Sequence, residues 1–126
     1  MNRPLILFAA LGGFSGVALG AFAAHGLKHS LPPDMLPVFQ TGTHYQLLHS
    51  LALLALGLAG SPLGKYGHWA GHAFAAGIVL FSGSLYLLAL TGIRPLGAIT
   101  PLGGLAFLAG WACLALAGWR HRADGN

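Results

Sequence analysis

The sequence predicts an all-α integral membrane protein: a four-helix bundle with both termini on the cytoplasmic side. Of its 126 residues 56% are hydrophobic and 6% are charged, whereas a soluble domain carries about 25% charged residues. So little charge cannot cover a water-facing surface, and lipid must therefore surround most of the chain. No segment alternates as a strand does, and four strands could not close a barrel. We expect one membrane domain over residues 1–126.

Four apolar segments are separated by loops that contain glycine, proline and charged residues. Each segment is near or above the ~20 residues that a helix needs to cross about 30 Å of hydrocarbon. Ser30 or Asp34 is expected to start the second helix, with Pro37 in its first turn, and Thr100 to cap the fourth before Pro101. The expected helices cover residues 4–26, 34–60, 66–91 and 101–119.

The first apolar segment also resembles a signal peptide, because Ala21-Phe22-Ala23 matches the small-x-small cleavage pattern. However, its apolar stretch over residues 5–24 is longer than the 7–15 residues typical of such a signal. Small residues also recur at every fourth position, which draws a smooth ridge along one helix face. We therefore expect a retained transmembrane helix whose packing residues are Gly12, Gly16, Gly20 and Ala24.

Small residues also mark the third and fourth expected helices. Gly71 stands between Gly67 and Ala75 at the same fourfold spacing, and Gly103 and Gly104 open a surface near the start of the last helix. Such positions let helix backbones approach closely. The contacts predicted here could lie within one bundle or between copies of it, and the sequence leaves both alternatives open.

Basic residues predict the orientation, because cytoplasmic loops carry an excess of lysine and arginine. Lys28 and Arg94 flank the expected helices on one side. The side shared by both termini and the middle loop carries Arg3, Lys65, Arg120 and Arg122. This excess predicts that both termini lie in the cytoplasm.

Polar side chains gather toward the outer half of the expected bundle, at His25, Gln40, His44, Tyr45, His49, Ser84 and Tyr86. In one interpretation they hydrogen-bond across helices, as such groups commonly do in membranes. In the other, His25 and His44 lie at similar depth on neighbouring helices and ligate haem iron or a transition metal. No carboxylate lies deep in a span to support a ligating histidine, since Asp34 is expected at the loop before the second helix and Asp124 in the C-terminal tail.

Several functional classes are disfavoured by what the chain lacks. Without a buried acid, no nucleophile, base and orienting group can be assembled, so we expect no enzyme and no catalytic residue. The basic residues are scattered rather than gathered in a stripe, which disfavours nucleic acid as a partner. Cys113 is the only cysteine and is expected to be a buried, inert thiol.

The leading hypothesis is therefore a non-enzymatic scaffold, accessory subunit or assembly partner without a cofactor. Its expected partners are the lipid bilayer and either another membrane protein or further copies of itself. The alternatives are a haem- or metal-binding bundle and, more weakly, a pathway for a small solute or for protons through the outer polar residues.

Four stretches, "LGAFAAHGLK" (19–28), "FQTGTHYQLLHSLALL" (39–54), "FSGSLYLLAL" (81–90) and "ITPLGGLAFLAGW" (99–111), resemble successive signatures of domain-of-unknown-function family 423. These are small inner-membrane proteins related to the eukaryotic transmembrane protein 256 group. The resemblance implies a compact four-helix, multi-pass protein of the cell inner membrane with no established activity, cofactor or substrate. The matching positions are Gly20, Ala24, His25, Gly26, Thr41, Gly42, Tyr45, Gln46, His49, Gly83, Ser84, Tyr86, Pro101, Gly103, Gly104 and Trp111.

Overall fold

The computed structural model describes the backbone of residues 1–125 and the side chains of residues 1–120, and the described chain contains no strand. The predicted all-α fold is thereby confirmed. Arg122 and Asp124, used above for orientation and for the carboxylate count, have side chains outside the described set. The long helices are α1 (Arg3–His25), α2 (Leu36–Ala59), α3 (Gly64–Gly77), α4 (Gly83–Thr91) and α5 (Thr100–Gly125). The short elements are η1 (Leu27–His29), η2 (Ser61–Leu63), the π-helical η3 (Ile78–Ser82) and η4 (Arg94–Ala98).

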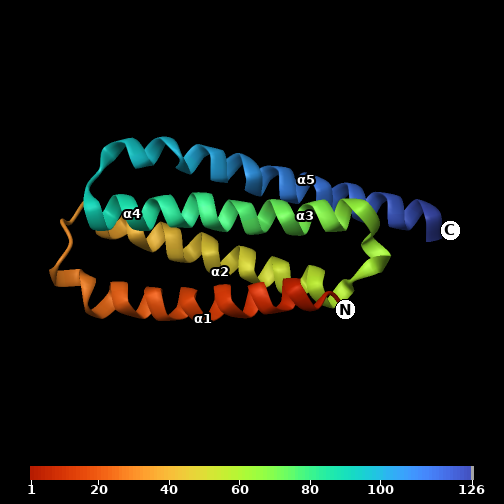
Figure 1. Cartoon of the computed structure of the whole chain (residues 1–126), viewed down its shortest axis with the longest axis horizontal. Helices are drawn as coiled ribbons and strands as arrows, with labels where there is room; N and C mark the ends of the chain where they lie inside the picture. Colours follow the sequence, from red (N-terminus) through yellow and green to blue (C-terminus); the bar gives the residue numbers. More distant parts are fainter. Residues whose placement is uncertain (126) are drawn as a thin grey trace.

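These elements form four rods, because α3, η3 and α4 follow one another without a break (Figure 1). α1 packs against α2, α3 packs against α5, and α2 joins the two pairs by contacting α3, η3 and α4. The N-terminus and the C-terminal part of α5 lie at the same end of the bundle (Figure 1). Four rods joined in succession by short connections bring both ends of the chain to one side, whereas the assignment of that side to the cytoplasm stays a prediction.

Three helical stretches of the described chain are long and apolar enough to cross a membrane: Arg3–His25, Ser61–Thr91 and Arg94–Arg120. The second expected span, α2, is not among them, because its N-terminal half carries many polar side chains. Several of these are buried inside the bundle rather than turned to lipid. α2 nevertheless extends alongside α1 (Figure 1). A helix of this composition can lie in a membrane when its polar side chains hydrogen-bond to other helices inside the bundle.

The observed ends of the helices differ from the expected ones for local reasons. α2 begins at Leu36 rather than at residue 34, its N-cap is Met35 without a side-chain cap, and Pro37 lies in its first turn as predicted. Thr100 already belongs to α5 instead of capping it. The third rod contains the π-helical turn Ile78–Ser82. The apolar pattern does not predict this turn, because a continuous apolar run looks the same whether its hydrogen bonds span four or five residues.

Two clusters of buried apolar side chains hold the rods together. The cluster nearer the end with the termini consists of Ala9, Leu53, Leu56, Ala70, Phe74, Ile78 and Phe107. The other, near the opposite end, consists of Ala23, Leu27, Phe39 and Ala89. Cys113, expected to be buried, is only partly so and packs against the first cluster.

Candidate functional site

Gln46 is the centre of a hydrogen-bond network that joins three helices, and it is 5% exposed. Its Nε2 donates to the carbonyl oxygen of Gly12 at 2.9 Å and to Oγ of Ser15 at 2.8 Å, both on α1. Its Oε1 accepts from the hydroxyl of Tyr86 on α4 at 2.6 Å. Without water in a bilayer, a buried amide must find such partners inside the protein. All three bonds tie α2 to its neighbours.

Three further hydroxyl groups form two more hydrogen bonds between rods. Oγ of Ser82 in η3 donates to the carbonyl oxygen of Gly42 on α2 at 2.7 Å. Oγ of Ser84 on α4 lies 2.6 Å from Oγ1 of Thr100 on α5. These contacts clamp the π-helical turn and the start of α5 to their neighbours, so Ser84 and Thr100 have structural partners at hand.

His49 is the one histidine buried in the described part of the chain, with an exposed fraction of 2%. Its Nδ1 lies 2.8 Å from the carbonyl oxygen of Tyr45, which can only accept, so the ring proton is assigned to Nδ1. Its Nε2 therefore accepts from Nε1 of Trp111 at 3.0 Å. The imidazole also stacks on the ring of Phe107, with centroids 3.7 Å apart. Both nitrogens are thus occupied, and neither is free to ligate a metal.

A cleft of about 580 Å³ opens between α2 and α5 beside His49. The rings of Tyr45, Phe81, Phe107 and Trp111 line it together with aliphatic side chains, Leu48, Leu105 and Leu108 among them. Trp111 is 42% exposed, yet its indole N–H is already bonded to His49. We call this hollow the aromatic cleft. It offers apolar surface at membrane depth with little polar chemistry inside it.

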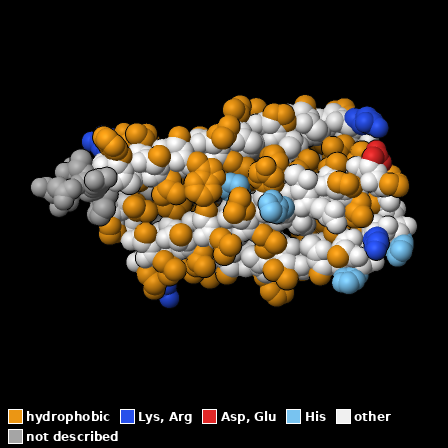
Figure 2. Space-filling model, turned by 180° about the vertical axis from the view of Figure 1, so that it is seen from behind, with side chains coloured by type: hydrophobic (Ala, Val, Ile, Leu, Met, Phe, Trp, Pro, Cys, Tyr) orange, Lys and Arg blue, Asp and Glu red, His pale blue; other side chains and the backbone are white. Residues whose placement is uncertain are grey.

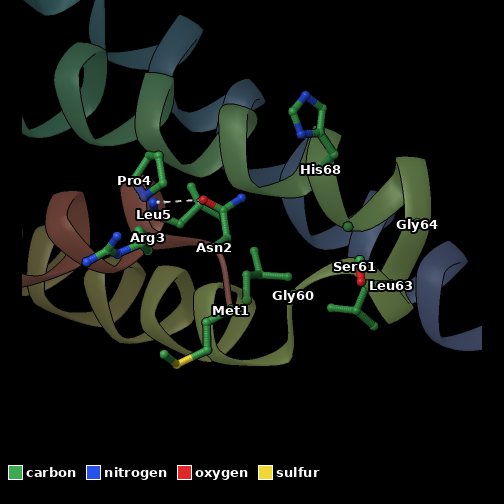
Figure 3. Close-up of a pocket in the computed structure, with 12 residues that line it drawn as sticks. Met1, Asn2, Arg3, Pro4, Leu5, Gly60, Ser61, Leu63, Gly64 and His68 are labelled. Atoms are coloured by element: carbon green, nitrogen blue, oxygen red, sulfur yellow. Dashed lines mark hydrogen bonds between the residues drawn. The ribbon is translucent and has the colours of Figure 1, made fainter.

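A second cavity, of about 560 Å³, lies at the end with the termini, between the start of α1 and η2 (Figure 3). Asn2 caps α1 there, since its Oδ1 accepts from the backbone N–H of Leu5 at 3.2 Å (Figure 3). The backbone N–H of Asn2 donates to the carbonyl oxygen of Gly57 at 2.7 Å, which ties the N-terminal segment to α2. Arg3 and His68 line the cavity, but no hydrogen bond joins them within the described chain.

The structure does not bring His25 and His44 to the same depth. Antiparallel packing of α1 on α2 sets Gly12 against Ser50 and Gly16 against Leu47. Extending this register places His25 opposite the turn after Leu36, roughly 10 Å along the axis from His44. Both side chains are exposed. Among the described residues no three His, Cys, Asp or Glu side chains gather as metal ligands.

The remaining predicted polar residues divide by helix face. His49, Ser84 and Tyr86 point inward and bond as described, whereas Gln40 is exposed and Tyr45 contributes its ring to the aromatic cleft. The predicted polar cluster did not include Gln46, Ser82 or Trp111, although the family resemblance includes Gln46 and Trp111 among its matching positions. Gln46 shares its helix face with Phe39, Gly42 and Leu53, and that angular relation is the signal that could have found it.

The ridge predicted along α1 is only half right. A Cβ added at Gly12 would lie 2.2 Å from Oγ of Ser50, and one added at Gly16 would lie 2.7 Å from the side chain of Leu47. A Cβ added at Gly20 would meet nothing within 4 Å, and Ala24 is exposed. Steps of four residues advance about 400° and so rotate 40° off the face each time. The buried face therefore continues at Ala23. Of the other packing residues predicted above, Gly71 and Gly103 are tightly packed and Gly104 is not.

Ser50 is the exception to the satisfied interior. Its Oγ is buried against Gly12 and has no hydrogen-bond partner, alone among the buried side-chain polar atoms of the described chain. Ser50→Ala should leave stability unchanged or raise it by about 1 kcal/mol, because it removes an unpaired polar group and leaves no partner behind. Ser82→Ala, which breaks a bond to Gly42, is the matched control and should cost about 1 kcal/mol. Equal losses for both variants in detergent unfolding would contradict this account of Ser50.

The family model and the relatives named here carry no function in their descriptions. A family model described as "Protein of unknown function (DUF423)" matches residues 19–104. The chain is 43% identical to the UPF0382 membrane protein YwdK of Bacillus subtilis, over 91% of this chain and 95% of that protein. It is 42% identical to the UPF0382 inner membrane protein YgdD of Escherichia coli, over 98% and 95% of the two chains. No solved structure matches significantly.

Proposed function

The chain belongs to the DUF423 family of proteins of unknown function, and we propose that it serves the inner membrane as a non-enzymatic scaffold, accessory subunit or assembly partner. The similarity to an inner membrane protein over nearly the whole chain supports this location. An accessory or scaffold role requires a rigid bundle with an outer surface that can bind other membrane proteins.

One observation carries the proposal: four of the six polar side chains buried in the described chain hydrogen-bond to a neighbouring element and so hold the helices together. Gln46, Ser82, Ser84 and His49 each bond to a neighbouring element. A general base or a metal ligand needs an atom left free to meet a substrate or a metal. Within the described side chains, the single buried polar atom without a partner is a serine hydroxyl that faces a glycine of α1. The interior therefore favours structure over chemistry.

The proposal is tested on protein extracted from native membranes in a mild detergent. We expect a colourless protein without stoichiometric metal that migrates as an assembly larger than one chain and dissociates in a harsher detergent. A Soret band or bound metal that is lost on His25→Ala or His49→Leu would overturn the proposal in favour of a haem or metal protein. A strictly monomeric protein at native abundance would also overturn it.

A further inference from the structure

The outward face of α2 is a continuous exposed stripe. Exposed residues recur along it at alternating intervals of three and four, which is the spacing of one helix face. They are Thr41, His44, Leu48, Leu51, Ala55 and Leu58, and we call this set the α2 stripe. No Asp, Glu, Lys or Arg lies anywhere in α2.

Two polar side chains on or beside this face lie alongside α1, which is long and apolar enough to cross a membrane. His44 is in the N-terminal part of the stripe, about 12 Å along the axis from Leu36, and Gln40 lies one turn before it at the edge of the stripe. Both are exposed, and neither side chain has a hydrogen bond within the described chain. Histidine side chains lie near the middle of the rear face of the bundle, surrounded by hydrophobic ones (Figure 2). In hydrocarbon an unpaired imidazole or amide is costly, so these groups call for an external partner.

The α2 stripe is also a ridge between two hollows. On one side lies the aromatic cleft, to which Leu48 contributes. On the other lies an apolar groove of about 520 Å³ between α1 and α2, lined in part by Leu51, Leu54 and Val17. A ridge flanked by grooves can receive the ridge of another helix beside it, as helices do when packed at about 20°. Shape and polarity thus point to a helix as the occupant.

We propose that a second copy of this chain occupies the α2 stripe, forming a dimer in which His44 and Gln40 of each copy hydrogen-bond to those of the other. A neutral imidazole and an amide each carry both a donor and an acceptor. His44 and Gln40 of one copy can therefore hydrogen-bond to the same two residues of the other copy. All copies insert with one orientation, so the two-fold axis runs along the bilayer normal and residues of equal depth meet. Because α2 is uncharged, no like charges oppose this contact. This inference deepens the proposed function and rests on it for the idea that the outer surface binds proteins.

Disulfide crosslinking in native membranes tests the interface. In a Cys113→Ala background, Leu48→Cys places one thiol on the α2 stripe. As a matched control, Leu87→Cys places one on an exposed position of α4 that lines neither hollow. Oxidation should give an adduct of twice the chain mass at Leu48→Cys, at least tenfold more than at Leu87→Cys. Adding His44→Leu and Gln40→Leu should lower that yield about tenfold, because the interhelical hydrogen bonds are lost. Both changes place apolar groups on an exposed face and so preserve the fold.

Equal crosslinking at both positions, or none at Leu48→Cys, would overturn the inference. An adduct of a different mass at Leu48→Cys would also overturn it, while leaving the proposed function standing with a different partner. Crosslinking that is unchanged after removal of His44 and Gln40 would refute the hydrogen bonding assigned to them. Failure of the proposed function would appear as bound haem or metal, or as a strictly monomeric protein in the mild detergent. Failure of this inference alone would leave a larger assembly that gives no homodimer adduct at Leu48→Cys.

Discussion

Gly103→Ala should destabilise the bundle by about 3 kcal/mol, the upper part of the range for overpacked sites. A Cβ at this position would lie 2.3 Å from the backbone nitrogen of Phe81 and 2.7 Å from its Cα. A backbone cannot rotate aside as a flexible side chain can, so α5 would have to move away from η3. Such a movement would also disturb Phe107, which lies one turn further along α5 in the first buried cluster.

The neighbouring Gly104 supplies the control for this prediction. A Cβ there would meet only the ring edge of Phe81, at 4.0 Å. Gly104→Ala should therefore be neutral or slightly stabilising, because alanine favours a helix over glycine by up to about 1 kcal/mol. Unfolding of both variants by SDS in mixed micelles, followed by circular dichroism, gives the comparison. Equal stability of the two variants would contradict the close approach of α5 to η3.

Gln46→Leu should cost about 2 kcal/mol, the second large effect. The change removes three hydrogen bonds, to Gly12, Ser15 and Tyr86, and interhelical bonds in membranes contribute about 0.6 kcal/mol each on average. It also leaves the Tyr86 hydroxyl without its acceptor. The same unfolding assay measures the loss, and a variant as stable as the parent would show that the network contributes nothing.

The fold could be predicted from the sequence because its cause is global: a chain with so little charge must be surrounded by lipid. α2 is the exception to this reasoning, because its composition is too polar for a membrane span, yet it lies alongside α1. Its buried Gln46 and His49 make it tolerable because they find hydrogen-bond partners on other helices, Tyr86 and Trp111. The π-helical turn at Ile78–Ser82 likewise depends on tertiary packing rather than on hydropathy.

The candidate site was harder to predict, because whether two side chains meet depends both on their positions along the bundle axis and on the helix faces they occupy. His25 and His44 seemed equivalent from their positions in sequence, but the register of α1 on α2 separates them along the axis. Likewise, Gly20 continues the spacing of Gly12 and Gly16 but not their face. Residue type alone gave His49 no special place among seven histidines. Its indole partner, Trp111, lies 62 residues away in sequence.

The most direct test of the central claim, that buried polar groups bind the helices together, is a double-mutant cycle on Gln46 and Tyr86. Unfolding free energies are measured for Gln46→Leu, Tyr86→Phe and the double variant, with Tyr45→Phe replacing Tyr86→Phe in a parallel control cycle. The Tyr45 hydroxyl has no hydrogen bond within the described chain, so that cycle should be additive to within about 0.5 kcal/mol. The account predicts a coupling of about 1 kcal/mol between Gln46 and Tyr86. Additive losses in both cycles would contradict it.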